Sequence, residues 1–365
     1  MTNLSDLWYK RTTPLILGIK QMVKSMTQLK RISALTIAAF LIIALGSSFA
    51  EPPKNPRFTA LEKHALSAKS ADEKDFATLA AFLVSKAKGD KEKAWCIYRW
   101  VTDRLAYNVE AFLAKDPGDN TVEMVLKTRL CVCEGYSRMF LKLCEEAGIE
   151  VVKVTGVARS GSKDAKGKPA FESHAWNAVK LDGKWELIDS TFGSGSVDKK
   201  AFVKNFELMF FSVPPEQMRF THFPEDAKWQ LLEKTITRED FDKQPLVQAS
   251  LFKLGLSPAS ILKTTKSSSF GGFPEIFDVA KTKIKVVEVP LNAKLKSGQI
   301  YRIAIESPEL SKVLILSNDK PQMNLQKQEI SFTEQVRALS GTMLIAVQKP
   351  NQGNEFSFLL RYQVE

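Results

Sequence analysis

The clearest pattern in the chain is a helical one that starts near residue 133. Its apolar residues recur every three or four positions and therefore share one face of a helix: Tyr136, Met139, Phe140, Leu143, Cys144 and Ala147. Gly148 follows as the expected helix end. Weaker patterns of the same kind predict helices over residues 73–87 and 91–107, the second capped by Asp90, and a short helix over residues 121–127.

A strand over residues 150–157 and then a β-hairpin are predicted after this helix. Residues 171–181 and 184–190 flank an Asp-Gly dipeptide, which is typical of a two-residue hairpin turn. If residue 181 pairs with residue 184, His174 and Asp189 lie diagonally opposite on one face of the hairpin. Their side chains are then within reach of each other.

The C-terminal half of the chain contains an aromatic-rich segment and then a series of short predicted strands. Residues 199–232 are rich in aromatic side chains and are predicted to pack around the first domain. Beyond about residue 248 the chain consists mainly of short β-type runs separated by turns, at residues 284–289, 299–306, 312–316, 330–333, 342–348 and 355–364. This spacing predicts a small β-sandwich of immunoglobulin-like type.

The N-terminus has the pattern of a secretory signal peptide. Residues 32–49 are almost uncharged, Lys30 and Arg31 precede them, and small residues at positions 48 and 50 predict cleavage after Ala50. Met26 would start a signal peptide of normal length, so residues 1–25 are interpreted as an extension. We therefore predict a secreted or periplasmic protein. The alternative is a single uncleaved N-terminal membrane anchor, which the short apolar core disfavours.

These features predict four parts: a signal peptide at residues 1–50, a Pro-rich linker at 51–71, a first domain at 72–247 and a β-sandwich domain at 248–365. The composition, 44% hydrophobic and 25% charged, is that of an ordinary globular protein. The net charge is +11, of which the first fifty residues carry +5. No run of Lys and Arg interleaved with aromatics is present, so we expect no nucleic-acid partner. Loose electrostatic association with the cell envelope stays open, and the sequence does not indicate an oligomeric state.

The four cysteines do not have the spacing of a disulfide framework. Cys131 and Cys133 could close only a very small, strained ring, and Cys144 lies on the apolar face of its helix. No second cluster of zinc ligands lies near them, so neither a metal nor a cofactor is predicted. We interpret one cysteine as reactive and the other three as buried thiols.

Cys133, His174 and Asp189 are the candidate catalytic residues. Cys133 lies at the first turn of its helix, where unpaired N–H groups and the helix dipole favour a thiolate. His174 would take the thiol proton and later donate it to the leaving amine, and Asp189 would orient the imidazole. The alternatives are a structural thiol, a hydrogen-bonded strand histidine, and an aspartate that caps the turn at residues 190–191.

Other residues compete less well for these roles. Cys131 falls outside the helix, and its alternative role is to protect Cys133 by reversible oxidation. His222 is a weaker candidate base, because no carboxylate is predictably placed opposite it. His64 lies in a charged helical stretch and is expected to be solvated.

The three motifs resemble those of the transglutaminase-like (papain-related) superfamily: Cys133-Glu134-Gly135-Tyr136, His174-Ala175-Trp176-Asn177 and Trp185-Glu186-Leu187-Ile188-Asp189. Residues 221–226, residues 229–232 and the β-rich tail resemble its kyphoscoliosis-peptidase and cytokinesis-protein-3 branch. The resemblance implies an α+β fold, with a papain-like transglutaminase core of helices packed on an antiparallel sheet and an all-β immunoglobulin-like sandwich after it. It also implies acyl transfer from amides through Cys133, His174 and Asp189.

The chain departs from the family pattern at two places. Cys131 stands where a glycine is common, and the loop at residues 117–119 lacks the tryptophan with which animal transglutaminases stabilise the oxyanion. The Cys133 N–H is one expected oxyanion donor, with Tyr107 as the candidate for the second. Calcium ligands cannot be assigned. We therefore expect an exported thiol enzyme that acts on protein or peptide amides, as a peptidase or amidase rather than a crosslinker. The alternative is a non-catalytic envelope scaffold or binding protein that keeps this fold.

Overall fold

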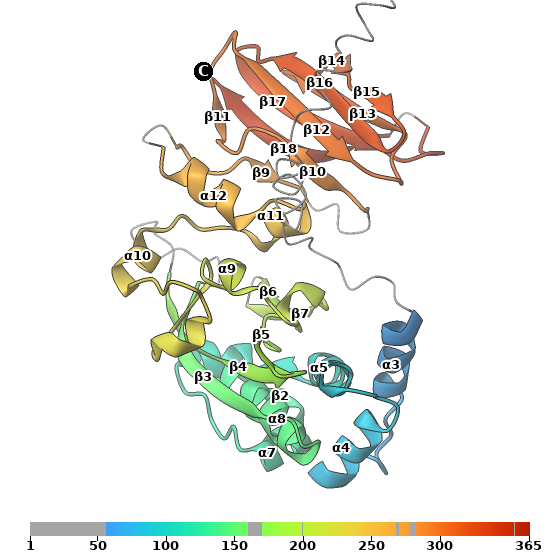
Figure 1. Ribbon diagram of the computed structural model, residues 1–365, viewed down its shortest axis with the longest axis vertical. Helices are drawn as coiled ribbons and strands as arrows, with labels where there is room; N and C mark the ends of the chain where they lie inside the picture. Colours follow the sequence, from blue (N-terminus) through green and yellow to red (C-terminus); the bar gives the residue numbers. More distant parts are fainter. Residues whose placement is uncertain (1–55, 160–169, 199, 268–269, 278–281, 354) are drawn as a thin grey trace, which may run out of the picture. The chain divides into compact units, whose positions relative to one another are not determined.

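The computed structural model describes residues 56–159, 170–198, 200–267, 270–277, 282–353 and 355–365 (Figure 1). The predicted signal peptide, its cleavage after Ala50 and the alternative membrane anchor lie outside these residues. Among the described residues, no helix has the length and apolar character needed to cross a bilayer.

The first described helices are α3 (Pro56–Leu66), α4 (Phe76–Val84) and α5 (Asp90–Arg104). The prediction of a linker is wrong for α3, whose Leu61 and Ala65 are buried against the core of the first domain. The expectation that His64 is solvated is also wrong, because its side chain is 9% exposed and its Nε2 lies 2.8 Å from the carbonyl oxygen of Phe82. The apolar stripe of α3 is too short to stand out in the sequence.

Helix α5 ends three residues earlier than predicted. Ala106–Tyr107 form strand β1, which pairs in parallel with β2 (Leu130–Cys131). Helices α6 (Val109–Ala114) and α7 (Val122–Thr128) lie between these two strands in the sequence. The pairing of β1 with β2 brings Tyr107 beside Cys131, close to the helix that begins at Cys133. This contact between distant segments overrides the helical pattern.

The first domain contains an antiparallel sheet with the strand order β5-β4-β3-β8. Its members are β3 (Val151–Ala158), β4 (Glu172–Leu181), β5 (Lys184–Ile188) and β8 (His222–Pro224). The predicted hairpin register is confirmed, since Leu181 pairs with Lys184 and Asn177 with Ile188. Asp182 and Gly183 have φ angles of 49° and 86°, as a two-residue hairpin turn of this type requires.

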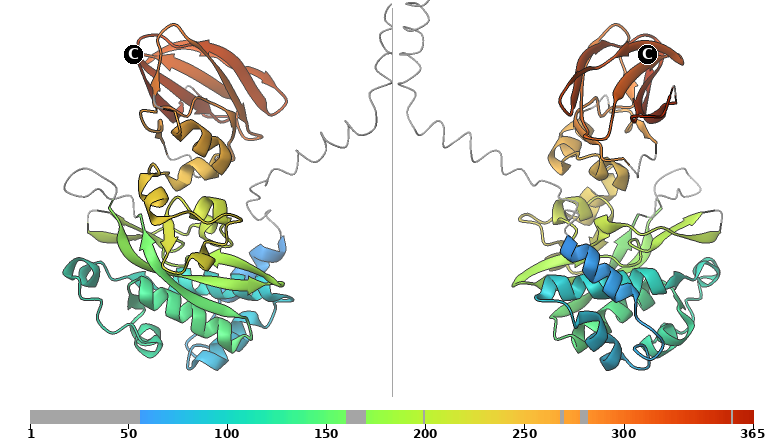
Figure 2. Two further views of the ribbon diagram at one scale, coloured as in Figure 1. Left: turned by 60° about the vertical axis from the view of Figure 1, so that its left-hand side comes forward. Right: turned by 90° about the vertical axis from the view of Figure 1, so that its right-hand side faces the viewer.

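Helix α8 (Cys133–Glu146) packs against β3 and β4 of this sheet (Figures 1 and 2). Its buried face carries Tyr136, Met139 and Phe140, as the sequence predicted. Gly148 has a φ of 72° and donates its N–H to Glu145, which ends the helix. The expected core of helices packed on an antiparallel sheet is therefore present.

The aromatic-rich segment after the hairpin holds short elements: β6 (Gly195–Asp198), β7 (Ala201–Lys204), η2 (Leu208–Phe210), α9 (Pro215–Met218), η3 (Ala227–Gln230) and α10 (Arg238–Lys243). Phe206 and Phe211 contact the rings of Trp95 and Tyr98, so this part packs around the first domain as predicted. Phe220 instead belongs to the core of the C-terminal region.

The C-terminal region begins with two helices that the sequence analysis did not predict, α11 (Ala249–Lys253) and α12 (Pro258–Thr265). Strands follow: β9 (Glu275–Ile276), β10 (Lys285–Glu288), β11 (Lys294–Leu295), β12 (Ile300–Glu306), β13 (Lys312–Ser317), β14 (Lys320–Asn324), β15 (Gln326–Gln328), β16 (Ser331–Arg337), β17 (Gly341–Gln348) and β18 (Ser357–Val364). They form one sheet in the order β10-β12-β16-β15 and another in the order β11-β18-β17-β13-β14, with β9 on β18. Buried residues of both sheets share one apolar core. The immunoglobulin-like type of this region stays a prediction.

Candidate functional site

Cys133 is the first residue of α8, and the chain before it is held in place by a buried asparagine. The Oδ1 atom of Asn120 accepts the backbone N–H of Val132 at 3.1 Å. A Cβ atom at Gly135 would lie 2.4 Å from the Cβ of Cys131 and 2.8 Å from Asn120 Oδ1, so only glycine fits there. The close approach fixes the N-terminus of α8 and with it the position of half-buried Cys133.

The other three cysteines, Cys96, Cys131 and Cys144, are buried free thiols, as predicted. Burial raises the pKa of the Cys96 thiol to about 12 and raises the pKa values of Cys131 and Cys144 as well. These thiols therefore stay protonated near neutral pH, and Cys133 is the most accessible of the four.

His174 and Asp189 meet on one face of the hairpin, as the register predicted. His174 Nε2 lies 2.9 Å from Asp189 Oδ2, and both side chains are buried. The other carboxylate oxygen, Oδ1, accepts the backbone N–H groups of Thr191 at 2.8 Å and Phe192 at 3.1 Å. Asp189 therefore caps the turn and contacts the imidazole at the same time. The turn-capping role and the role of orienting His174 do not exclude each other.

The electrostatics favour a charged imidazole. Burial acts to lower the pKa of His174, but the charge and hydrogen bond of Asp189 and the hydrogen bond with Cys133 outweigh it and raise this pKa to about 10. Burial likewise acts to raise the pKa of Asp189, and the two histidines that it contacts hold it below its usual range. Because Asp189 occupies Nε2 of His174, Nδ1 is the nitrogen left for the Cys133 sulfur.

His222 reaches the same carboxylate, which the sequence reasoning missed. Its Nε2 lies 3.0 Å from Asp189 Oδ2, and its Nδ1 lies 2.8 Å from Thr221 Oγ1. Burial lowers the pKa of His222, so this ring is neutral near pH 7. His222 ranked below His174 because no carboxylate is predictably placed opposite it. The structure places Asp189 there, because β8 joins the sheet beside β3, and no local pattern predicts that pairing. The available signal was the family resemblance of residues 221–226.

Gly156 makes the approach of β8 sterically feasible. A Cβ atom at this position would lie 2.2 Å from the carbonyl oxygen of Phe223 and 2.8 Å from the Cα of Pro224. Gly156 pairs with His174 on one side and with Pro224 on the other. A single glycine on β3 therefore lets the strands that carry the two histidines come together around Asp189.

His174, Asp189 and His222 are also the residues that could hold a metal ion in the described part of the chain. One ligand atom from each lies within 4.8 Å of the others, and imidazole with carboxylate suits zinc and similar metals. In the structure the same atoms are joined by two hydrogen bonds that use both imidazole Nε2 atoms. The arrangement therefore satisfies all three groups without an ion.

Tyr107 is the last residue of β1, and it pairs with Cys131 two residues before Cys133. Burial raises the pKa of its hydroxyl, and the electrostatic effect of Cys133 adds to this, so the hydroxyl stays a hydrogen-bond donor. The rings of Phe112 and Phe202 lie 5.8 Å and 6.5 Å from the Tyr107 ring. These contacts place the Tyr107 ring among apolar neighbours. Its role as the second oxyanion donor stays a prediction.

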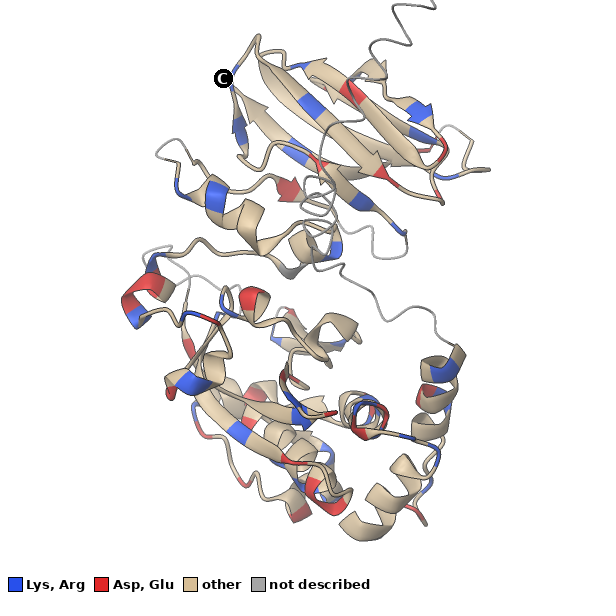
Figure 3. Cartoon of the chain, in the orientation of Figure 1, with Lys and Arg blue, Asp and Glu red and all other residues tan. Residues whose placement is uncertain are grey.

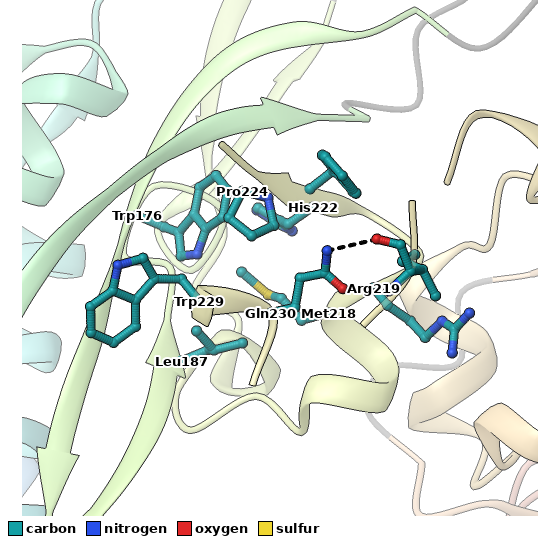
Figure 4. Close-up of a pocket in the computed structure, with 10 residues that line it drawn as sticks. Trp176, Leu187, Met218, Arg219, His222, Pro224, Trp229 and Gln230 are labelled. Carbon is teal, nitrogen blue, oxygen red and sulfur yellow. Dashed lines mark hydrogen bonds between the residues drawn. The ribbon is translucent and has the colours of Figure 1, made fainter. Parts of the chain in front are cut away.

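A small cavity lies next to His222 (Figure 4). Its volume is about 10 Å³, and Trp176, Met218, Trp229 and Gln230 are among the residues that line it. Trp176 Nε1 is buried and has no hydrogen-bond partner among the described residues. A space of this size holds about one water molecule, so this cavity is not a substrate pocket.

Comparison with known proteins covers the region that contains the first three site residues. The transglutaminase-like superfamily matches residues 77–190. These residues are a transglutaminase-like domain. Cys133, His174 and Asp189 lie within the matched range, whereas His222 lies beyond it.

The relatives of this domain confirm the predicted branch of the superfamily. Kyphoscoliosis peptidase of Mus musculus is 31% identical over 184 residues, which cover 50% of this chain and 28% of that protein. The Lim and transglutaminase domain protein ltd-1 of Caenorhabditis elegans is 28% identical over 218 residues, which cover 55% of this chain and 29% of that protein. The matches thus span less than a third of the length of these relatives. A solved TGase structure shares 19% identity, with 45% of this chain and 40% of that chain covered, at a TM-score of 0.26.

Proposed function

We propose that the protein is a thiol-dependent acyl-transfer enzyme that acts on amide bonds of proteins or peptides. The observation that carries this proposal is the position of His174, whose Nε2 lies 2.9 Å from Asp189 Oδ2 and whose ring lies near enough to Cys133 for this residue to help raise the pKa of the imidazole. A purely structural thiol has no need of an imidazole that a buried carboxylate keeps charged. The transglutaminase-like domain adds support, since it contains all three residues.

The reaction would start with attack of the Cys133 thiolate on the carbonyl carbon of the amide, and the π electrons of that bond would move to its oxygen. The Cys133 backbone N–H and the Tyr107 hydroxyl are the proposed donors to this oxyanion. Collapse of the intermediate would break the carbon–nitrogen bond while His174 donates its proton to the leaving amine. An acyl-enzyme remains on Cys133, with His174 neutral and ready to accept a proton from the second nucleophile.

We propose water rather than a primary amine as the second nucleophile. Water gives a peptidase or amidase, and an amine gives a crosslinking enzyme. Two observations favour hydrolysis: the loop at residues 117–119 lacks tryptophan, and the mouse relative is named a peptidase.

We further propose an exported protein, on the evidence of the apolar segment at residues 32–49 and its basic flank. The substrate proposed above is a protein or peptide and not a nucleic acid. Acidic and basic residues are interspersed along the described helices and strands in the view of Figure 3, which does not favour a polyanion as the substrate. Loose association with the cell envelope is proposed on the net charge alone.

Labelling with iodoacetamide at pH 7, followed by peptide mapping, tests the site in the purified protein. We expect rapid labelling at Cys133, loss of that labelling in Cys133→Ala, and unchanged labelling in Cys131→Ala. The second variant is a matched control because its thiol lies two residues away and is buried. Equal labelling of the two variants would contradict the assignment of Cys133.

A trapped acyl-enzyme tests the reaction itself. Incubation with glutamine-containing peptides or peptide esters should add the mass of one acyl group to Cys133, and hydroxylamine should release it. If Cys133 reacts with iodoacetamide but never carries an acyl group, the protein is better described as a non-catalytic scaffold that keeps this fold.

A further inference from the structure

One oxygen atom of Asp189 accepts hydrogen bonds from two histidines. The Oδ2 atom lies 2.9 Å from His174 Nε2 and 3.0 Å from His222 Nε2. A triad needs only the first of these contacts. We propose that His222 is a positioning residue, so that the functional unit is a tetrad in which His222 holds Asp189 and Asp189 holds His174. This inference rests on the proposed thiol chemistry and deepens it.

The hydrogen bonds of Asp189 show why a second donor matters. Its side chain is fully buried, and a buried carboxylate is stable only when its oxygens are well supplied with donors. Oδ1 accepts two backbone N–H groups, from Thr191 and Phe192. Without His222, the Nε2–H of His174 would be the one side-chain donor to Oδ2. His222 supplies a second donor from another strand, β8, and so holds the carboxylate in place while the catalytic proton is transferred at Nδ1 of His174.

The surroundings of His222 hold it in the form that can donate. The ring is 2% exposed and lies against Trp176 and Phe192. The groups of ionisable type that face it are Asp189 and His174, whose ring centroid lies 5.3 Å away. A neutral ring that carries its proton on Nε2 leaves Nδ1 as an acceptor, and the Thr221 hydroxyl lies 2.8 Å from that atom. Because the charged carboxylate of Asp189 can only accept, it selects the tautomer with the proton on Nε2, and the Thr221 hydroxyl is the partner of Nδ1.

The second donor affects the proton in the hydrogen bond between His174 Nε2 and Asp189 Oδ2. An N–H donor on Oδ2 stabilises the charged carboxylate and makes Asp189 a poorer proton acceptor. The proton then stays on His174, which keeps the Cys133 thiolate paired with an imidazolium. Without the donor, Asp189 would be protonated more easily as the pH falls, and this ion pair would be lost at a higher pH.

Three variants separate a positioning role from simple packing. His222→Phe keeps a ring but removes the donor, His222→Gln keeps an N–H group, and Thr221→Val removes the partner of Nδ1. His64→Gln is the matched control, because it replaces another buried histidine, which contacts the carbonyl of Phe82 and the hydroxyl of Ser85. Folding of each variant is checked by its circular dichroism spectrum and thermal midpoint.

The measurement is the rate of Cys133 alkylation by iodoacetamide between pH 5 and pH 9. We expect His222→Phe to lower the rate at pH 6 by about 100-fold and to move the acid limb of the profile to higher pH. His222→Gln should stay within about fivefold of the wild type, because its N–H group takes over the contact. Thr221→Val should shift the acid limb in the same direction but less, and His64→Gln should leave the profile unchanged.

Several results would overturn the inference. One is a folded His222→Phe protein with an unchanged pH profile, and another is a His222→Gln protein as slow as His222→Phe. If His222→Phe does not fold, an unchanged profile in Thr221→Val together with a slow His222→Gln would have the same meaning. Uptake of one Zn²⁺ per chain, lost in His222→Gln and required for wild-type activity, would assign His222 to a metal site instead. The proposed function fails in a different way, when Cys133 of the wild-type protein is not selectively alkylated.

Discussion

His222 Nε2 lies 3.0 Å from Oδ2 of Asp189, although 33 positions separate the two residues in the chain. Asp189 belongs to the transglutaminase-like domain at residues 77–190, and His222 lies on a strand beyond it. The segment after the matched domain therefore contributes a side chain to the candidate site. The carboxylate that orients His174 depends on contacts from both parts of the chain.

Asp189→Asn should abolish most of the activity without unfolding the protein. The amide lacks the negative charge that holds the proton on His174, and its N–H group would oppose the donor of His222. We expect kcat to fall by about 10³- to 10⁴-fold with little change in KM. Asp182→Asn in the exposed hairpin turn is the matched control and should be close to wild type. Retention of a tenth or more of the activity by Asp189→Asn would argue against a catalytic role for Asp189.

Tyr107→Phe tests the second oxyanion donor. Burial keeps the hydroxyl protonated, and loss of a single donor of this kind costs about 10²-fold in kcat. The rate of Cys133 alkylation should change little, because alkylation by iodoacetamide forms no oxyanion on a tetrahedral carbon. Tyr301→Phe in the C-terminal region is the control. An equal loss in alkylation and in turnover would show that Tyr107 positions Cys133 and does not stabilise an oxyanion.

Gly156→Ala should destabilise the protein and separate β8 from β3. The added methyl group would lie 2.2 Å from the Phe223 carbonyl oxygen, and overpacking of this kind costs about 1–3 kcal/mol. Because β8 carries His222, alkylation of Cys133 should also slow at low pH. Urea denaturation measures the loss of unfolding free energy in Gly156→Ala. Gly89→Ala, whose nearest neighbour would be the Asp182 side chain at 3.3 Å, should have a much smaller effect. Equal stability of the two variants would contradict the close approach.

The stability of the protein should depend on His222 at mildly acidic pH. Burial lowers the pKa of His222 in the folded protein below 6.5, so the unfolded chain binds more protons as the pH falls through that value. The stabilisation from neutral His222 is therefore fully present above about pH 7 and is lost below it. His222→Gln removes this titrating ring, while the N–H group of the glutamine side chain can keep the contact with Asp189.

Urea denaturation at pH 5, 6, 7 and 8 measures this effect. The difference in unfolding free energy between wild type and His222→Gln should grow in favour of the wild type from pH 5 to pH 7, by at most about 1.4 kcal/mol per pH unit. A constant difference over this range would show that His222 titrates normally.

Much of the candidate site could be predicted from sequence because its first three residues sit on local patterns. The helical periodicity placed Cys133 at the start of α8, and the Asp-Gly turn fixed the register that brings His174 to Asp189. Each of these features depends on contacts within one helix or one hairpin. The coupling of the helix to the hairpin came from the resemblance to a family and not from periodicity.

The sequence by itself determined the elements whose pattern is complete within about fifteen residues: α8, the hairpin of β4 and β5, and most strands of the C-terminal region. Only the tertiary structure decided that α3 packs on the first domain, that Tyr107 leaves its helix to pair with β2, and that β8 places His222 on Asp189. These features depend on pairing between segments far apart in the chain. Such contacts arise from steric fit, as at Gly156, and leave little trace in the order of apolar and polar residues.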